Sequence, residues 1–443
     1  MIDVKLLRET PDVFYENCRM RGFGKDELDR FFELDSTWRE NLKAINDLKR
    51  EKNEITRSIA SAVKSGSSVN DQKTRVNEIN GKIREHEERQ GNVEKERERV
   101  LSLIPNLIHK DVVEGKGDDQ NRFMRFWGNA QVHREDQEEF NLRTEGKGKF
   151  TSIGSRPISH VDLEESLGLV DVERAGKISG ARFFYIKGRL MKLELALINY
   201  AIDFFSERAF TPVEPPYMMR YDPMSKATDI ETFKESLYKI EGEDLYLIST
   251  SEHPIAAMLS DEILMPEELP IRVAGFSPCF RREAGAHGKD TKGIFRVHQF
   301  NKVEQFIFCK PEDSWDFLEE LINNAEAIIQ SLGLSYRVID FCSGELSRLN
   351  ARKYDLEVWF PAQGKFREVI SASNNTDFQA RSLNIRYRTK EGNRFIATLN
   401  STGIAVQRIL VAIMENFQSE DGKEIRIPEA LIPYTGFDRI TTP

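Results

Sequence analysis

Apolar residues follow a near-heptad spacing in two long stretches close to the N-terminus. The first stretch, 27–63, lacks proline and glycine, and its apolar positions are Phe31, Leu34, Trp38, Ile45, Leu48, Ile55 and Ile59. The second carries Val76, Ile79, Ile83, Val93 and Val100 and stops near Pro105. Both patterns predict helices, and segment 65–70 between them has a turn composition. Two helices of roughly 35 residues joined by a short turn form an antiparallel arm on the order of 50 Å long.

The charged exterior of this predicted arm leaves its role open. Lysines and arginines are dense along both helices, but acidic residues nearly balance them. A charged exterior of this kind is usually a solvated face. A structural or dimerising coiled coil and an arm that binds nucleic acid are therefore both compatible with the pattern.

Beyond Pro105 the pattern changes. Segment 105–156 predicts a linker that leads into irregular structure. A long helix is predicted from Leu190 to about Glu207, and the prolines that follow at 212–216 favour extended chain. Short apolar or alternating segments then predict strands at 245–248, 272–276, 305–308, 336–341, 353–360, 366–372 and 394–399, with helices at 314–332 and 404–417. Adjacent strands with helices grouped outside indicate an α+β domain built on an antiparallel sheet.

Composition narrows the class of protein. The chain has 443 residues and a net charge of −9, with 39% hydrophobic and 31% charged residues. This balance favours a folded chain with a sizeable core and does not favour broad nonspecific binding of nucleic acid. The four cysteines are scattered without zinc-site spacing, so we expect a reducing compartment and no structural zinc. Because the first residues contain no apolar core segment, we expect no secretory signal there, and no apolar run is long enough to span a membrane.

The chemistry of the chain is concentrated in segment 278–306. Adjacent Arg281 and Arg282 offer planar, bidentate donors that suit a polyphosphate, while Glu283 and Glu304 add acids to the same segment. The glycines between them fit neither a Walker loop nor a dinucleotide fingerprint. The residues alone therefore indicate a nucleotide site with a small polar or cationic group beside it.

Three blocks in chain order resemble the signature motifs of class II aminoacyl-tRNA synthetases, and their details resemble seryl-tRNA synthetases. They are the long helix followed by Pro215-Pro216, the FRRE to VEQF stretch ending at Phe306, and the block 399–418 that contains Asn400, Thr402 and Arg408. The resemblance extends over nearly the whole chain. It implies an N-terminal tRNA-binding domain at 1–110, with its helical hairpin at about 27–103, and a catalytic domain at 111–443.

The resemblance assigns one group of residues to ATP. In that family the residue matching Arg281 grips the α-phosphate and the amino-acid carboxylate, the residue matching Arg408 contacts the far phosphates, and the match to Phe300 stacks on adenine. Arg281, Glu283 and Arg408 are the implied catalytic residues. The implied ATP contacts are Arg281, Arg282, Glu283, Val297, His298, Gln299, Phe300, Glu368, Val369, Ile370, Ser371 and Arg408. Glu368 and Ser371 match the family's metal site and imply Mg²⁺, a cation that prefers oxygen ligands.

A second group is implied to hold serine. It consists of Thr250, Ser251, Glu252, Arg281, Glu304, Asn400 and Thr402, with Glu304 facing the serine hydroxyl. A buried carboxylate needs a hydrogen-bond donor, so such a pocket rejects amino acids that lack a hydroxyl. Without their motif, Phe300 would be interpreted as a core aromatic and Glu304 as an exposed strand residue.

Two histidines, His287 and His298, invite interpretation as catalytic bases. Activation of an ionised carboxylate needs no general base, so structural or loop-contact roles are favoured for both. The resemblance places the glycine-containing loop 285–293, which includes Lys289, Asp290 and Lys292, near the acceptor end of tRNA.

The resemblance implies a cytoplasmic, homodimeric ligase that joins serine to tRNA(Ser), with tRNA(Sec) as a second candidate substrate. The arm is then expected to grip the long variable arm of the tRNA. The alternatives are a class II ligase for another amino acid or a carrier protein, and a nonenzymatic paralogue that only binds tRNA. A dead copy would be expected to lose Arg281, Glu283, Glu368 or Arg408, and all four are present.

Overall fold

A computed structural model describes residues 1–64, 68–230, 234–283 and 292–441. The chain forms two compact units, residues 1–105 and residues 106–443. Each unit has its own secondary-structure elements.

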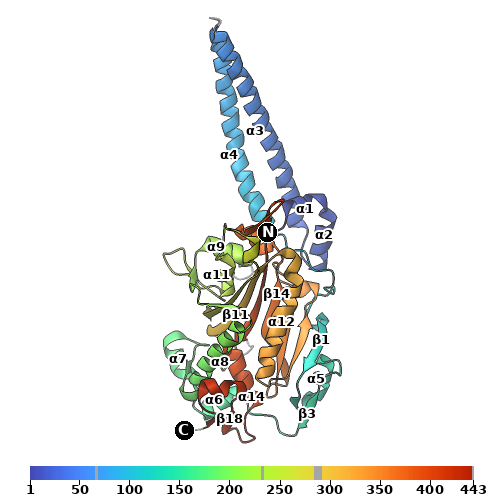
Figure 1. Ribbon diagram of the computed structural model, residues 1–443, viewed down its shortest axis with the longest axis vertical. Helices are drawn as coiled ribbons and strands as arrows, with labels where there is room; N and C mark the ends of the chain where they lie inside the picture. Colours follow the sequence, from blue (N-terminus) through green and yellow to red (C-terminus); the bar gives the residue numbers. More distant parts are fainter. Residues whose placement is uncertain (65–67, 231–233, 284–291, 442–443) are drawn as a thin grey trace. The chain divides into compact units, whose positions relative to one another are not determined.

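The first unit contains the predicted arm. Two short helices, α1 (Val4–Glu9) and α2 (Pro11–Met20), precede the long helices α3 (Asp26–Lys64) and α4 (Asn70–Leu103). The long helices pack side by side as a hairpin (Figure 1), which confirms the prediction. Buried Asn41 joins them, because its side chain contacts the His86 ring and donates to the backbone carbonyl of that residue and to Gln90 Oε1.

One buried carboxylate, Asp35 of α3, ties the parts of this unit together. Arg8 of α1 approaches it to 2.6 Å, Arg97 of α4 to 2.8 Å, and Arg39 of its own helix to 3.3 Å. The Arg97 guanidinium also lies over the Phe31 and Trp38 rings. Burial alone would raise the pKa of Asp35, but the hydrogen bonds from Arg8 and Arg97 hold it below its ordinary value.

The second unit is built on an eight-stranded sheet in the order β1-β12-β13-β14-β17-β11-β10-β6. Neighbouring strands are antiparallel except for the parallel pair β10 and β6. In that order the strands are Arg122–Trp127, Tyr336–Asp340, Arg352–Phe360, Lys365–Asn374, Ala397–Ala405, Gln299–Cys309, Ile271–Phe280 and Thr211–Val213. The predicted antiparallel sheet is thus confirmed, and its central strands are long enough to present a face of several side chains.

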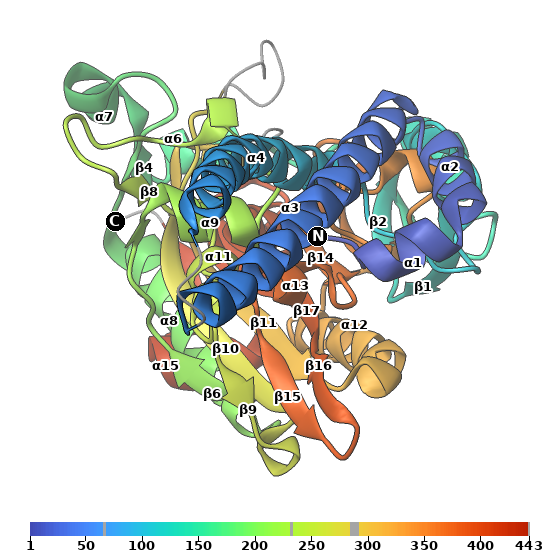
Figure 2. The ribbon, with the colours of Figure 1, turned by 90° about the horizontal axis from the view of Figure 1, so that it is seen from above.

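Three helices cover one face of the central strands (Figure 1): α8 (Gly188–Ser206), α12 (Ser314–Ser331) and α14 (Val406–Asn416). Figure 2 shows α8 and α12 from above, near the strands β10, β11 and β17. Their apolar sides form the main core with the sheet. Side chains of β11 that point to this face use its helices as partners. Asn301 donates to Glu194 of α8, and Gln305 donates to the Leu321 carbonyl of α12. Residues of β11 with even numbers consequently point to the opposite face.

Smaller elements surround this sheet. The helices are α5 (Gln137–Arg143), α6 (His160–Ser166), α7 (Val172–Ser179), α9 (Tyr221–Ala227), α11 (Glu252–Ala257), α13 (Phe378–Leu383) and α15 (Ile432–Thr435). The short strands are β2 (Ala130–His133), β3 (Phe150–Ile153), β4 (Val170–Asp171), β5 (Tyr185–Ile186), β7 (Met218–Met219), β8 (Tyr246–Leu247), β9 (Ile263–Leu264), β15 (Arg386–Thr389), β16 (Gly392–Phe395), β18 (Glu424–Arg426) and β19 (Arg439–Thr441).

Two sequence predictions were wrong. Segment 105–156 is not a linker, since β1 forms an edge of the main sheet, and β2, α5 and β3 follow it. Phe140 of α5 is fully buried against Trp359 of the sheet, a tertiary contact that periodicity does not reveal. The predicted strand 394–399 divides at Ile396 between β16 and β17, which lie in different sheets.

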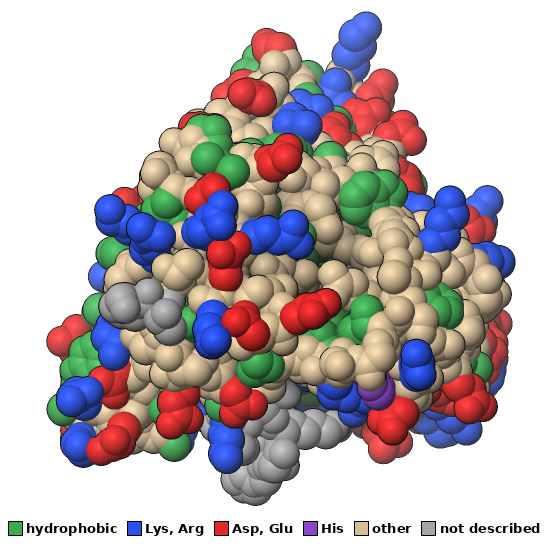
Figure 3. All heavy atoms as spheres, turned by 90° about the horizontal axis from the view of Figure 1, so that it is seen from below, with side chains coloured by type: hydrophobic (Ala, Val, Ile, Leu, Met, Phe, Trp, Pro, Cys, Tyr) green, Lys and Arg blue, Asp and Glu red, His purple; other side chains and the backbone are tan. Residues whose placement is uncertain are grey.

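The surface mixes charges of both signs. On the face drawn in Figure 3, Lys and Arg side chains (blue) and Asp and Glu side chains (red) are interspersed. Among the described residues, no helix combines the length and the apolar character that a membrane crossing requires.

Candidate active site

Polar side chains gather on the sheet face opposite the three large helices. Lys302 and Glu304 alternate along β11, while Asn400 and Thr402 alternate along the neighbouring strand β17. The register shifts between Val303 and Glu304, so Glu304 lies directly opposite Thr402. The extra residue in β17 is Gly403, where a Cβ atom would meet the Phe205 ring of α8 at 2.4 Å. This bulge aligns the polar residues of the two strands on one face.

Glu304 is the most buried acid of this face. Its carboxylate lies 2.5 Å from Lys302 Nζ, accepts a hydrogen bond from Asn400 Nδ2 at 3.2 Å, and lies 3.5 Å from Thr402 Oγ1. The ammonium of Lys302 stabilises the charge that burial would otherwise oppose. A hydroxyl-bearing ligand would thus meet a carboxylate that is already oriented by three side chains.

Glu252 begins α11 beside this cluster. Its carboxylate accepts from Asn400 Nδ2 at 3.0 Å, so Asn400 bridges Glu252 and Glu304. Burial, followed by the nearby charge of Glu304, raises the pKa of Glu252 to about 7. An added cation would favour the ionised form, so the pair of acids suits a ligand with an ammonium group. Thr250 accepts from the Glu252 backbone amide at 3.2 Å and fixes the turn into the helix.

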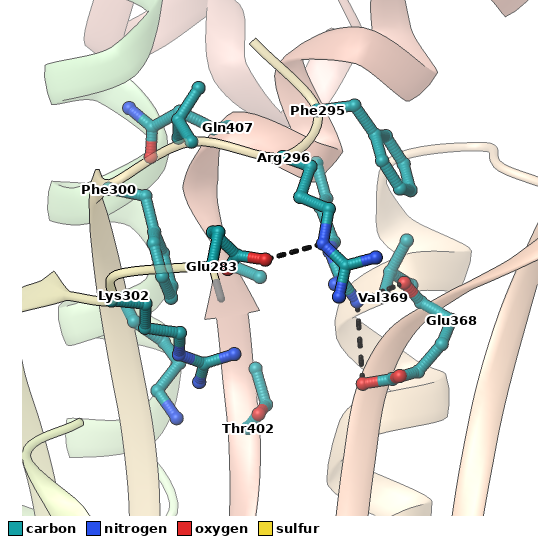
Figure 4. A pocket seen from close by; sticks show the side chains of 13 residues that line it. Glu283, Phe295, Arg296, Phe300, Lys302, Glu368, Val369, Thr402 and Gln407 are labelled. Carbon is teal, nitrogen blue, oxygen red and sulfur yellow. Dashed lines mark hydrogen bonds and ion pairs between the residues drawn. The ribbon is translucent and has the colours of Figure 1, made fainter. Parts of the chain in front are cut away.

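Arginines and aromatic rings form the adjoining part of the site (Figure 4). Arg281 follows the end of β10, and its guanidinium lies 5.0 Å from the centre of the Phe300 ring. Glu283 accepts from Arg296 Nε at 2.5 Å across the two sides of the connecting loop. Its backbone φ is +50°, a left-handed conformation that is uncommon outside glycine. These groups can supply an aromatic stacking surface and cations for phosphates.

Glu368 and Arg408 occupy the far side of this part. Arg408 Nη1 donates to the Glu368 backbone carbonyl at 2.7 Å and lies 3.4 Å from its carboxylate. Burial would raise the pKa of Glu368, but Arg408, Lys353 and Arg281 hold it below its ordinary value. A register shift between Leu356 and Glu357 marks an extra residue in β14. It brings Glu368 to the same face as Ser371.

The oxygen donors of Glu368 and Ser371 fit a hard cation. Both side chains line the same cavity, and the carboxylate is ionised at neutral pH. Mg²⁺ commonly takes one or two protein oxygens and completes its coordination with water and phosphate. Within the described ranges, no three His, Cys, Asp or Glu side chains form a metal-binding group. These residues therefore suit a cation that arrives with its ligand.

One cavity of about 500 Å³ unites these groups. It is lined by residues from both parts, including Thr250, Glu252, Arg281, Glu283, Arg296, Lys302, Glu304, Glu368, Ser371, Asn400 and Thr402. An adjoining hollow is lined by Val297, Phe300, Val369 and Arg408. A volume in this range holds a small-molecule ligand with several functional groups.

Some residues assigned from sequence lie elsewhere. Ser251 is fully buried and donates to the Gly275 carbonyl at 2.9 Å, so its hydroxyl serves the fold. In the part of the chain that the structure describes, Arg282, His298, Gln299 and Ile370 are also absent from the walls of both hollows. His287, Lys289 and Asp290 lie outside the described residues.

The sequence analysis missed several residues of the cavity wall, among them Lys302, Arg296 and His253. Lys302 and Arg296 lie within the motif segment, and His253 directly follows Glu252. Period-two alternation from Glu304 and Phe300 places Lys302 on their face of β11, a signal that could have identified it. His253 is buried, its Nδ1 has no hydrogen-bond partner among the residues that the structure describes, and burial lowers its pKa to about 3. No sequence pattern indicates that environment.

Comparisons with known proteins agree with this geometry. Residues 1–108 match the seryl-tRNA synthetase N-terminal domain, and residues 233–417 match the tRNA synthetase class II core domain (G, H, P, S and T). The chain is 62% identical over 440 residues to a serine–tRNA ligase of Picrophilus torridus, with 99% of each chain covered.

Solved structures give the same result. The seryl-tRNA synthetase of Pyrococcus horikoshii, complexed with ATP, is 46% identical with a TM-score of 0.96, and all of both chains is covered. The cytoplasmic serine–tRNA ligase of Naegleria fowleri, in complex with AMP, is 37% identical with a TM-score of 0.85, over 100% of this chain and 99% of that one. The chain therefore belongs to the seryl-tRNA synthetases, the class II ligases that join serine to tRNA.

Proposed function

We propose that this serine–tRNA ligase recognises serine with the Lys302, Glu304, Asn400 and Thr402 cluster and ATP with the arginine-lined part of the same cavity. The observation that carries the proposal is the oriented, buried carboxylate of Glu304. A serine hydroxyl donates to it, whereas alanine or glycine leaves it without that donor. Glu252 accepts a hydrogen bond from the amino group of the substrate, and Thr250 lies beside Glu252.

Serine activation then requires positioning rather than a general base. The serine carboxylate is ionised near neutral pH and attacks the α-phosphate of ATP in line, with release of pyrophosphate. Arg281 lines both parts of the cavity, which supports its role in binding the reacting carboxylate and phosphate. Arg408 and Arg296 stabilise the charge of the remaining phosphates, and Phe300 stacks on adenine. The ATP and AMP bound to the relatives support this nucleotide.

Glu368 and Ser371 are the residues that would hold Mg²⁺. The cation neutralises phosphate charge when it is bound with ATP. The ionised Glu368 is already held beside Arg408. The phosphates therefore meet an arginine and a metal-binding acid on the same side of the cavity.

The tRNA is the second macromolecular substrate in this proposal. The hairpin of α3 and α4 binds tRNA(Ser), with tRNA(Sec) as a further candidate, through shape and backbone contacts. The match of residues 1–108 to the family's N-terminal domain supports this role. The terminal ribose hydroxyl of the tRNA then attacks the carbonyl carbon of the seryl-adenylate, the acyl–phosphate bond breaks, and AMP leaves.

We also propose a cytoplasmic homodimer. The exposed apolar side chains Val172, Ile178, Tyr185, Met191 and Leu195 lie on α7, β5 and α8. Scattered apolar residues need no explanation, but several on neighbouring segments are typical of an interaction surface. Helix α8 belongs to the first class II block, which builds the dimer interface in the family that the chain resembles, and α7 and β5 precede it in the chain. Sedimentation equilibrium of the full chain tests the dimer directly.

The function is tested by ATP–pyrophosphate exchange with each of the twenty amino acids. Serine should drive exchange best. Stronger exchange with another amino acid would overturn the assigned specificity. An absence of exchange with every amino acid, in a folded protein that still binds tRNA, would favour the nonenzymatic alternative.

A further inference from the structure

The loop between β10 and β11 enters and leaves the site through a stem of two short segments, 281–283 and 296–298. The β10–β11 ladder extends into this stem, because the Arg281 amide donates to the His298 carbonyl at 2.9 Å. Each of the two stem segments also forms a backbone hydrogen bond with a further segment of the chain. The Arg282 amide donates to the Ser236 carbonyl, and the His298 amide donates to the Arg182 carbonyl. The stem is therefore a junction of three chain segments that are far apart in the sequence.

The His298 ring lies at the centre of this junction. Its Nδ1 is 2.8 Å from the Arg281 carbonyl oxygen and 3.0 Å from the Tyr238 hydroxyl. A carbonyl oxygen can only accept, so Nδ1 carries the proton and donates. The Phe183 ring stacks on the imidazole, with centroids 5.0 Å apart and planes 25° apart. Each of the three segments thus contacts one face or atom of the same ring.

We propose that His298 is a positioning residue for serine activation, which fixes the Arg281 backbone through Nδ1 and is itself held by Phe183 and Tyr238. The proposal rests on the function assigned to the cavity. His298 does not line that cavity among the described residues. Its effect is exerted on Arg281, which does line it.

The backbone beyond Arg281 shows why such support is needed. Glu283 has a φ of +50°, and a residue in this conformation persists only where its surroundings determine it. The Glu283 side chain is held by Arg296 on the other side of the stem. The Arg281 side chain has a longer contact, from Nε to the Ser249 carbonyl at 3.4 Å. The hydrogen bond from His298 Nδ1 to the Arg281 carbonyl is shorter, at 2.8 Å. It fixes the backbone position from which the Arg281 side chain extends.

The test compares two substitutions of His298 in the full-length protein. In His298→Asn the amide nitrogen can occupy the place of Nδ1 and still donate to the Arg281 carbonyl, whereas His298→Ala cannot. Exchange rates are normalised to active sites counted by the burst of seryl-adenylate. A displacement of about 1 Å in a positioned group can cost on the order of 10²-fold. We expect that loss in kcat for His298→Ala, with the KM for ATP changed less than about threefold because Phe300 and Arg408 are untouched.

Rescue distinguishes positioning from a purely structural role. We expect His298→Asn to recover most of kcat, and Tyr238→Phe, which removes one hydroxyl, to lose about two- to tenfold. The matched control is His133→Ala, which changes a histidine of β2 outside the cavity wall. Normal kcat per active site in His298→Ala, or equal loss in the Asn and Ala variants, would overturn the proposal. A wild-type protein without exchange would instead refute the proposed function itself.

Discussion

Asp35, at the base of the helical hairpin, and Glu304, in the central sheet, are both about 1% exposed. Asp35 is surrounded by Arg8, Arg39 and Arg97, and its oxygens are used within the first unit. Glu304 is paired with one lysine and forms part of a cavity wall. Burial and ion pairing are common to the two acids. The difference is that only Glu304 faces a volume where a ligand can reach it, and we infer that this access distinguishes a recognition residue from a structural one.

The largest effect should come from removing the arm. Replacement of residues 43–89 by a short Gly/Ser bridge should leave serine-dependent exchange within about twofold, because the cavity lies wholly in residues 106–443. Charging of tRNA(Ser) should become undetectable. The variant supplies its own control, since both reactions are measured on one preparation. Unchanged charging would remove the arm from tRNA recognition.

Glu304→Gln should come next in size. Loss of one charge from a buried, hydrogen-bonded pair costs enough to lower kcat/KM for serine on the order of 10²- to 10³-fold. Dissociation of ATP, measured by equilibrium binding, should change little. Glu357→Gln is the matched control, because Glu357 is paired with Arg337 in the same sheet but does not line the cavity. Equal losses for serine and ATP would show that Glu304 is structural.

Asp35→Asn should have the opposite profile. Exchange should be unaffected, while the four helices of the first unit lose about 2–3 kcal/mol of stability, a value reduced because Arg8 and Arg39 reach solvent. Hydrogen exchange of the full-length protein measures this loss. Folding lowers the pKa of Asp35, so the ionised carboxylate stabilises the folded state at pH values above the ordinary pKa of aspartate. This stabilisation is lost as the pH falls from there through the lowered pKa of the folded state. The difference between variant and wild type should therefore disappear in acid.

The smallest effect is a pH dependence set by Glu252. Its pKa of about 7 means that the free enzyme protonates it in mildly acidic solution, where it binds the serine ammonium poorly. We expect kcat/KM for serine to fall about tenfold per pH unit below 7 and to level off above 7. Glu252→Gln should remove this acidic limb. A limb that persists unchanged in the variant would assign it to another group.

Glu252 should also affect stability, with a pH dependence opposite in sign to that of Asp35. Folding raises the pKa of Glu252, so the native state binds more protons than the unfolded state between about pH 4.5 and 7. Stability from this group is therefore lost as pH rises through that window. Glu252→Gln should become more stable relative to wild type from pH 5 to pH 8, and a constant difference would contradict the assignment.

Sequence periodicity predicted the elements whose faces are amphipathic. The hairpin of α3 and α4 and most strands of the main sheet were found this way, because one side of each is buried. Segment 105–156 was misinterpreted, since its strands and α5 are stabilised by contacts such as Phe140 with Trp359. Tertiary packing of this kind leaves no periodic signal in a short segment.

Site residues that belong to motifs could be predicted from the sequence. Residues whose role depends on strand pairing and side-chain direction could not. Arg281, Glu304 and Asn400 were identified from their motifs, whereas Lys302 depends on its alternation with Glu304 along β11. Ser251 stands between two cavity residues in sequence, but its hydroxyl turns into the sheet toward Gly275. The bulges that place Glu304 opposite Thr402 and Glu368 beside Ser371 depend on strand pairing. No single strand reveals such a register.

The central hypothesis is that Glu304 recognises serine by accepting a hydrogen bond from its hydroxyl. Its most direct test is ATP–pyrophosphate exchange with serine, alanine and glycine, in the wild type and in Glu304→Gln. A site built around a hydroxyl should favour serine over alanine by roughly 10⁴-fold or more in the wild type, and this preference should collapse in the variant. A preference for serine that survives the substitution undiminished would contradict the account.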